Sequence, residues 1–146
     1  MIRKIATLSE LQDIAREILS RCTQKDTAQV IALSGDLGAG KTAFTKQLAS
    51  VLGIPEEITS PTFVIMKSYS IPAHTFLKTL IHIDAYRIES DDEMSVLKFD
   101  ELLKDPANLI CIEWPEKIES VLPQDIHPVT LALENDGTRV VTFDIP

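Results

Sequence analysis

Hydrophobic and polar positions follow one another along this chain in short runs that predict a sheet. Residues 29–34 and 109–112 are almost continuously apolar, which is typical of strands buried on both faces of a parallel sheet. Three further segments have the composition of strands, namely residues 2–7, 63–71 and 77–84. The pattern therefore predicts a core of buried strands, with other strands beside it.

Other stretches repeat their apolar residues at helical spacing. A helix is predicted from Ser9, as the N-cap, to about Arg21, and a second helix covers residues 43–52, with Gly53 as the residue that ends it. Two acidic residues favour the start of a third helix near 92–98. The buried face expected for the first helix consists of Leu11, Ile14, Ala15, Ile18, Leu19 and Cys22.

Near the carboxyl end, a turn signal lies between two more strand-like runs. Residues 129–133 and 140–145 flank Asn135-Asp136-Gly137, a sequence typical of a tight β-hairpin. Strands then outnumber helices, so the fold class is α/β. With 146 residues the chain has the length of one domain, and we expect residues 1–146 to form it.

One segment carries a specific chemical signal. Between the strand at 29–34 and the following helix, residues 35–42 match the phosphate-loop pattern G-x-x-x-x-G-K-T. In this pattern, backbone N–H groups and the positive end of the helix face phosphate groups. Lys41 would neutralise the β and γ oxygens, and the Thr42 hydroxyl would ligate Mg²⁺. The chain is therefore predicted to bind a nucleoside triphosphate.

Hydrolysis requires further acidic groups, and two candidates follow predicted strands. Glu113 comes directly after the run 109–112, where phosphate-loop enzymes place a second, usually aspartic, magnesium ligand; otherwise it is a solvated acid at a strand end. Asp84 ends the strand 77–84 and would orient the attacking water, with Arg87 fixing its position; otherwise the two form a salt bridge.

Three other features are open to more than one interpretation. Residues 59–62, which include Ser60 and Thr62, form either a switch loop that closes on the γ-phosphate or a plain turn. His82 shares a strand face with Asp84, and a buried histidine with satisfied hydrogen bonds is the favoured interpretation. Trp114 either covers the nucleotide, anchors a partner or belongs to the core.

Charge and composition narrow the possible partners. Asp and Glu number 22 against 14 for Lys and Arg, a net charge of −8 that argues against a large interface with DNA or RNA. Any nucleic acid is then expected to be handled by a partner protein. The longest apolar runs are far too short to span a membrane, and no secretory signal is recognisable. Cys22 and Cys111 have no metal-site spacing, and we expect reduced, buried thiols in a cytoplasmic protein.

Taken together, four motifs resemble one family, the bacterial TsaE (YjeE) ATPases, which act in making threonylcarbamoyladenosine on tRNA. The phosphate loop is followed, in the same order and at similar spacing, by the other three. These read Ser60-Pro61-Thr62-Phe63, His82-x-Asp84-x-Tyr86-Arg87 and Ile112-Glu113-Trp114-Pro115-Glu116. One difference is Ala43, where the family commonly has a second threonine, which removes a possible hydroxyl contact with the α-phosphate.

The resemblance implies a P-loop NTPase-like, three-layer fold with a parallel core sheet and antiparallel flanking strands. It also implies hydrolysis of Mg-ATP in support of a TsaD–TsaB complex, with tRNA involved only indirectly. Thr42 and Glu113 would hold Mg²⁺, and Asp84 and Lys41 would be catalytic. The nucleotide site would comprise Asp36, Leu37, Gly38, Ala39, Gly40, Lys41, Thr42, Ser60, Thr62, Glu113, Trp114, Pro115 and Glu116.

Other functions of phosphate-loop proteins are less well supported. A small-molecule kinase usually gathers several arginines around the transferred group, whereas only Arg87 and Arg139 follow the loop here. A GTP-driven switch would need Asp-x-x-Gly and Asn/Thr-Lys-x-Asp motifs, and the sequence contains neither. A module that binds nucleotide without hydrolysis stays open, and substitution of Asp84 would distinguish it from an ATPase.

Overall fold

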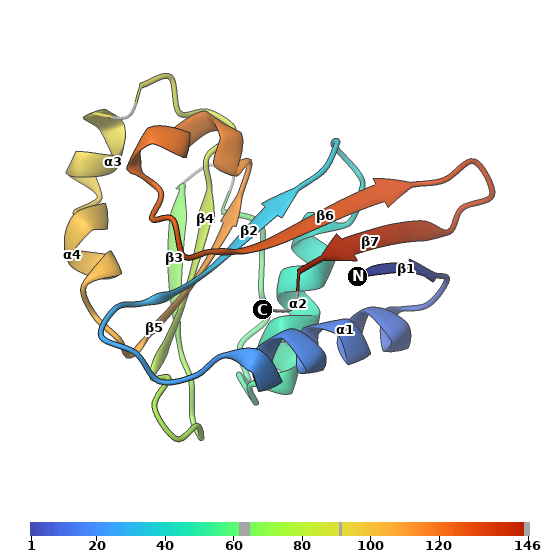
Figure 1. The fold of residues 1–146 in the computed structure, drawn as a ribbon, viewed down its shortest axis with the longest axis horizontal. Coiled ribbons are helices and arrows are strands. Elements are labelled where there is room, and N and C mark those ends of the chain that lie inside the picture. The colour runs from blue at the N-terminus through green and yellow to red at the C-terminus, as the bar shows by residue number, and fades with distance from the viewer. Residues whose placement is uncertain (62–64, 91, 145–146) are drawn as a thin grey trace.

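A computed structural model describes residues 1–61, 65–90 and 92–144. Seven strands form one sheet in the order β1-β7-β6-β2-β5-β4-β3 (Figure 1). The four central strands β6, β2, β5 and β4 are mutually parallel, whereas β1, β7 and β3 pair antiparallel at the flanks. The strands are β1 (Ile2–Ile5), β2 (Gln29–Ser34), β3 (Met66–Ser70), β4 (Thr79–Asp84), β5 (Asn108–Glu113), β6 (His127–Leu133) and β7 (Arg139–Phe143).

Helices cover both faces of the sheet, which gives three layers. The helices α1 (Leu8–Arg21) and α2 (Lys41–Val51) pack on one face. The short helices α3 (Asp92–Val96) and α4 (Phe99–Leu103) and the 3₁₀ helix η1 (Pro115–Val121) pack on the other. The predicted α/β fold with a parallel core and antiparallel flanking strands is confirmed.

The two buried clusters explain why β2 and β5 are apolar throughout their middle positions. On β2, Ile31 and Leu33 contact the cluster under α1 and α2, and Val30 contacts the cluster under α3, α4 and η1. Because successive side chains of a strand point to opposite faces, a strand covered on both faces needs apolar residues throughout. This is why the run 29–34 was recognisable as a buried strand.

The predicted hairpin is also present. Strands β6 and β7 pair antiparallel with Leu133 opposite Arg139, and Gly137 between them has a positive φ of 85°. The backbone N–H of Glu134 donates to the carbonyl of Thr138 at 2.8 Å, which closes the turn. The predicted run to residue 145 is longer than β7, and residues 145–146 lie outside the described part of the chain.

Several predicted boundaries were wrong. Strand β1 ends at Ile5 rather than 7, β4 begins at Thr79 rather than 77, and β3 covers Met66–Ser70, with residues 62–64 outside the described ranges. The helix expected near 92–98 ends at Val96. Lys98 follows with a positive φ of 56°, which breaks the helical path before α4 begins. Neither α4 nor η1 was predicted.

The N-cap of α1 is Thr7, not Ser9. The Thr7 hydroxyl accepts a hydrogen bond from the Glu10 backbone N–H at 3.2 Å, and Glu10 in turn accepts from the Ala6 backbone N–H at 3.1 Å. The first bond satisfies an N–H group that the first helical turn leaves without a partner, and the second holds the residue before the cap. Both Thr7 and Ser9 have capping side chains, so composition alone did not separate them.

The corrected cap gives a direct stability prediction. We expect Thr7→Ala to lower the free energy of unfolding by about 1 kcal/mol, because it removes the oxygen that accepts from Glu10. Ser9→Ala, the matched control, is expected to change it by less than about 0.5 kcal/mol. Urea unfolding curves measure both. A larger loss in Ser9→Ala than in Thr7→Ala would contradict the assignment.

Both cysteines are free and buried, as expected. Burial raises the pKa of the Cys22 thiol to about 11 and that of the Cys111 thiol to about 12. The thiolate is the reactive form of cysteine, so burial disfavours reaction of both groups at neutral pH. Their role is therefore packing.

Candidate functional site

The predicted phosphate loop connects β2 to α2, and close packing explains two of its three glycines, Gly35 and Gly40. A Cβ on Gly35 would lie 2.4 Å from the carbonyl oxygen of Leu131 on β6, and the φ of Gly35 is +149°. A Cβ on Gly40 would lie 3.0 Å from Nε of Arg139 on β7. The loop is thus pressed against the parallel strand β6 and the hairpin strand β7, and its last two residues, Lys41 and Thr42, already belong to α2.

Lys41 is almost fully buried, with its amino group over the loop. Its Nζ donates hydrogen bonds to the carbonyl oxygens of Gly35 and Asp36, the latter at 2.9 Å. The same nitrogen lies 4.2 Å from the centroid of the Trp114 ring, within cation–π range. Burial lowers the pKa of Lys41, and the negative charges of Glu113, Glu116, Asp84 and Asp36 partly offset that effect.

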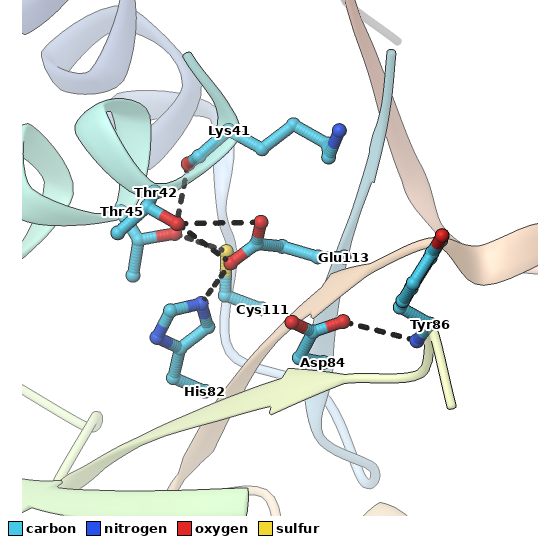
Figure 2. A network of polar contacts seen from close by, with 8 residues as sticks. All are labelled: Lys41, Thr42, Thr45, His82, Asp84, Tyr86, Cys111 and Glu113. Atoms are coloured by element: carbon cyan, nitrogen blue, oxygen red, sulfur yellow. Dashed lines mark hydrogen bonds and ion pairs between the residues drawn. The ribbon is translucent and has the colours of Figure 1, made fainter. Parts of the chain in front are cut away.

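The two predicted acids lie side by side at the carboxyl edge of the sheet. Asp84 ends β4 and Glu113 ends β5, and the parallel register pairs these two residues. Both side chains are buried, at 7% and 4% exposure. Asp84 Oδ1 accepts a hydrogen bond from the Tyr86 backbone N–H at 3.0 Å, which orients its carboxylate (Figure 2).

Glu113 faces the beginning of α2. The Thr42 hydroxyl lies 3.2 Å from Oε2 and 3.4 Å from Oε1 of Glu113, so it donates to this carboxylate (Figure 2). On its other side, Glu113 Oε2 lies 2.6 Å from Nε2 of His82. His82 is therefore buried, as expected, but its Nδ1 has no hydrogen-bond partner within the described ranges, which corrects the expectation of a fully satisfied ring.

A cavity of about 320 Å³ joins these groups. Its walls come from the phosphate loop and α2, from the ends of β4 and β5, and from the connection before β3 that contains Ser60. The described lining residues are Leu37, Gly38, Gly40, Lys41, Thr42, Ala43, Ser60, Asp84, Tyr86, Arg87, Glu113 and Trp114. The cavity therefore brings together eight residues that the sequence placed in the nucleotide site, and Asp84, which it predicted to be catalytic.

Other predicted residues lie elsewhere or are not described. Asp36, Ala39, Pro115 and Glu116 do not line this cavity, although Asp36 holds Lys41 through its backbone carbonyl. Pro115 opens η1, and Glu116 lines neighbouring surface hollows instead. Thr62 lies outside the described residues, so its expected role in a switch is a prediction still.

The tryptophan after Glu113 has an unusual backbone. Trp114 has a positive φ of 61°, which is uncommon for a bulky residue, and its N–H donates to the carbonyl of Leu33 at 3.2 Å. This conformation brings its ring next to Tyr86, with the two centroids 5.1 Å apart, and over Lys41. Trp114 is therefore part of the cavity wall, and its partly buried side chain also packs against the cluster under α3, α4 and η1.

Arg139 beside the loop was missed at the sequence level as a site residue. Its Nε donates to the carbonyl of Ala39 at 3.0 Å, so a cation from β7 lies against the phosphate loop. The two hydrogen-bonded residues are 100 positions apart in the sequence. The sequence predicts the hairpin turn just before Arg139. It does not show beside which strand of the sheet, and so beside which loop, this hairpin lies.

The oxygen atoms at the start of α2 fit the preferences of Mg²⁺. Thr42 and Glu113 present a hydroxyl and a carboxylate to one another, and both are hard oxygen ligands. The described residues contain no group of three or more His, Cys, Asp or Glu side chains placed to hold a metal. That is compatible with Mg²⁺, which commonly uses one or two protein ligands and takes the others from water and phosphate.

Comparison with known proteins decides the family. The family model "Threonylcarbamoyl adenosine biosynthesis protein TsaE" matches residues 5–141. The chain belongs to the TsaE family. It is 41% identical over 115 residues to TsaE of Bacillus subtilis, covering 78% of this chain and 68% of that protein. It is 38% identical over 133 residues to TsaE of Treponema pallidum, covering 90% and 93%.

A solved structure agrees with this membership of the TsaE family. The crystal structure of YdiB from Bacillus subtilis is similar with a TM-score of 0.72 and 28% identity, over 100% of this chain and 86% of that one. The family places the chain in the biosynthesis of tRNA threonylcarbamoyladenosine. Within the described residues, no helix is long and apolar enough to cross a membrane.

Proposed function

We propose that this TsaE-family chain is a cytoplasmic ATPase that hydrolyses Mg-ATP in support of a TsaD–TsaB complex during tRNA modification. One observation supports this most strongly. The hydroxyl of Thr42 faces the carboxylate of Glu113 at the start of α2, in the same cavity as Lys41 and Asp84. These are the side chains that a phosphate-loop ATPase requires, and they come from three separate elements.

Each side chain has a distinct proposed task. Lys41 and the loop N–H groups bind the phosphate oxygens, and Thr42 and Glu113 hold Mg²⁺. The metal, when bound, neutralises phosphate charge. Asp84, fixed by the Tyr86 N–H, accepts a hydrogen bond from the attacking water and orients it toward phosphorus.

Slow turnover of the isolated chain follows from the shortage of cations in the cavity. Among its described lining residues, only Lys41 and Arg87 carry a positive charge. A dissociative phosphoryl-transfer transition state spreads charge over three oxygens, and additional cations or an ordered switch would stabilise it. Docking of TsaD–TsaB against the segment that contains Ser60 would supply that order.

The test combines binding and turnover. Trp114 is the only tryptophan in the chain, so intrinsic fluorescence reports directly on the cavity wall. We expect Mg-ATP to change this emission saturably, with Trp114→Phe as the control that removes the signal. We also expect TsaD and TsaB together to raise phosphate release by about tenfold or more.

Three outcomes separate this proposal from its alternatives. Binding without phosphate release, even with both partners, would indicate a nucleotide-dependent interaction module. Transfer of the phosphoryl group to a small metabolite instead of to water would indicate a kinase. No fluorescence change with any nucleotide, together with no phosphate release, would contradict nucleotide binding altogether.

A further inference from the structure

His82 lies in the middle of β4 and is completely buried. The register places it beside Cys111 on the parallel strand β5 and beside Lys67 on the antiparallel strand β3. Its relative exposure is 0%, and neither the proposed phosphate contacts nor the proposed hydrolytic step uses it. A buried polar ring with no assigned task therefore lies directly behind the proposed metal ligand.

The contacts of His82 are unequal. Nε2 lies 2.6 Å from Oε2 of Glu113, whereas Nδ1 is buried without a hydrogen-bond partner in the described part of the chain. An ionised carboxylate only accepts hydrogen bonds, so Nε2 carries the proton and donates it. Glu113 therefore sets the tautomer of His82, and the ring in turn fixes one carboxylate oxygen.

Burying a polar ring at this position is less favourable than burying a hydrocarbon side chain. Leaving Nδ1 without a partner costs free energy that a phenylalanine or leucine at the same position would avoid. Leu80, two residues earlier on the same face of β4, is fully buried in the cluster under α1 and α2, so a hydrocarbon side chain suits this face. The polar ring at position 82 is thus explained by what it does for Glu113.

Glutamate has a particular need for such support. Its side chain has one more rotatable bond than aspartate, and its terminal torsion has a broad energy minimum. A strand-end glutamate is therefore a less defined metal ligand than an aspartate unless a neighbour restrains it. Here Thr42 approaches from α2 and His82 from β4, so the carboxylate is held from two sides (Figure 2).

We propose that His82 is a positioning residue that holds the Glu113 carboxylate in the orientation required for Mg²⁺. This inference rests on the proposed function, since it concerns the metal of the same site. His82 contacts neither the nucleotide nor the metal; it acts through Glu113. Hydrogen-bond partners behind a metal ligand commonly raise metal affinity in this way.

The test compares three variants. His82→Phe keeps the ring volume and removes the donor, and His82→Gln places an amide nitrogen near the original Nε2. The matched control is His127→Gln. His127 is partly buried at the opposite end of the sheet, where it contacts Gln29 at 3.2 Å. Thermal unfolding of each variant establishes that it folds. If His82→Phe does not fold, His82→Asn replaces it, because its shorter amide does not reach Glu113.

The readout is Mg²⁺ affinity and not turnover. Each protein is titrated with ADP in EDTA and then with Mg²⁺ at fixed ADP, and Trp114 fluorescence is followed. We expect His82→Phe to raise the Mg²⁺ concentration for half-saturation by about 10- to 100-fold, with ADP affinity in EDTA unchanged. His82→Gln should recover most of the loss, and His127→Gln should match the wild type.

The failures are distinguishable. If Mg²⁺ does not change the binding of ADP by the wild-type protein, the proposed function is contradicted. If the wild type responds to Mg²⁺ but His82→Phe responds equally well, the positioning role is overturned and the proposed function stands. Equal defects in His82→Phe and His82→Gln, or a loss of ADP affinity in EDTA, would show that His82 contributes packing alone.

Discussion

Replacing Asp84 with asparagine is expected to lower steady-state phosphate release by about 100-fold or more while leaving the affinity for Mg-ATP unchanged. Asparagine has the same shape, and its Oδ1 still accepts the hydrogen bond from the Tyr86 N–H that orients the side chain at 3.0 Å. What it lacks is the negative charge that would hold and polarise an attacking water. The variant therefore separates hydrolysis from binding.

Release is measured with the TsaD and TsaB partners present, and binding by Trp114 fluorescence. Asp26→Asn is the matched control, because Asp26 is exposed in the turn before β2 and far in sequence from either acid. Phosphate release by Asp84→Asn at the wild-type rate would remove Asp84 from the catalytic assignment. Loss of nucleotide affinity in that variant would instead make Asp84 a binding residue.

Much of the fold could be predicted from the sequence, because buried strands and an amphipathic helix produce clear patterns of hydrophobic residues. The run 29–34 coincides with β2, and Gly53 after α2 has the expected positive φ of 75°. Lys98 shows where the patterns fail. Nothing in its side chain favours a positive φ, so the break between α3 and α4 depends on tertiary packing, in which Met94 and Phe99 both enter the cluster beneath β4 and β5.

The candidate site was predictable as a set of residues but not as an arrangement. The sequence placed Asp84 and Glu113 at the ends of two strands, and only the sheet order shows that β4 and β5 are neighbours with these residues in register. Arg139 and the Glu113 contact of His82 both depend on pairing between distant segments. Such pairing is set by packing of the whole sheet, which local periodicity does not encode.

Lys41 lies among several negatively charged side chains. Four acidic groups act on its amino group, namely those of Glu113, Glu116, Asp84 and Asp36. Without the lysine, a triphosphate entering this cavity would meet negative charge that the loop N–H groups alone must offset. The acids that suit Mg²⁺ therefore make the lysine more important for binding phosphate.

We expect Lys41→Met to weaken ATP binding by about 100-fold, which corresponds to about 3 kcal/mol for the loss of one or two charge-assisted hydrogen bonds. Methionine keeps the buried volume and removes only the charged end. Fluorescence of Trp114 measures the affinity, with its starting emission recalibrated because the Lys41 amino group lies over the ring. Lys46→Met, an exposed position on the same helix, is the control. Affinity retained in Lys41→Met would contradict the assignment of residues 35–42 as the phosphate site.

The same variant has a pH signature that is independent of nucleotide. Burial lowers the pKa of Lys41 from its ordinary value of 10.5, so between the two values the unfolded chain binds more protons than the folded one. The free energy of unfolding contributed by this group must then rise with pH through that window and level off above 10.5. Subtracting the denaturation profile of Lys41→Met from that of the wild type isolates the effect. A difference that falls with increasing pH would mean that the amino group is held in its charged form by the four acids, and that their attraction outweighs burial.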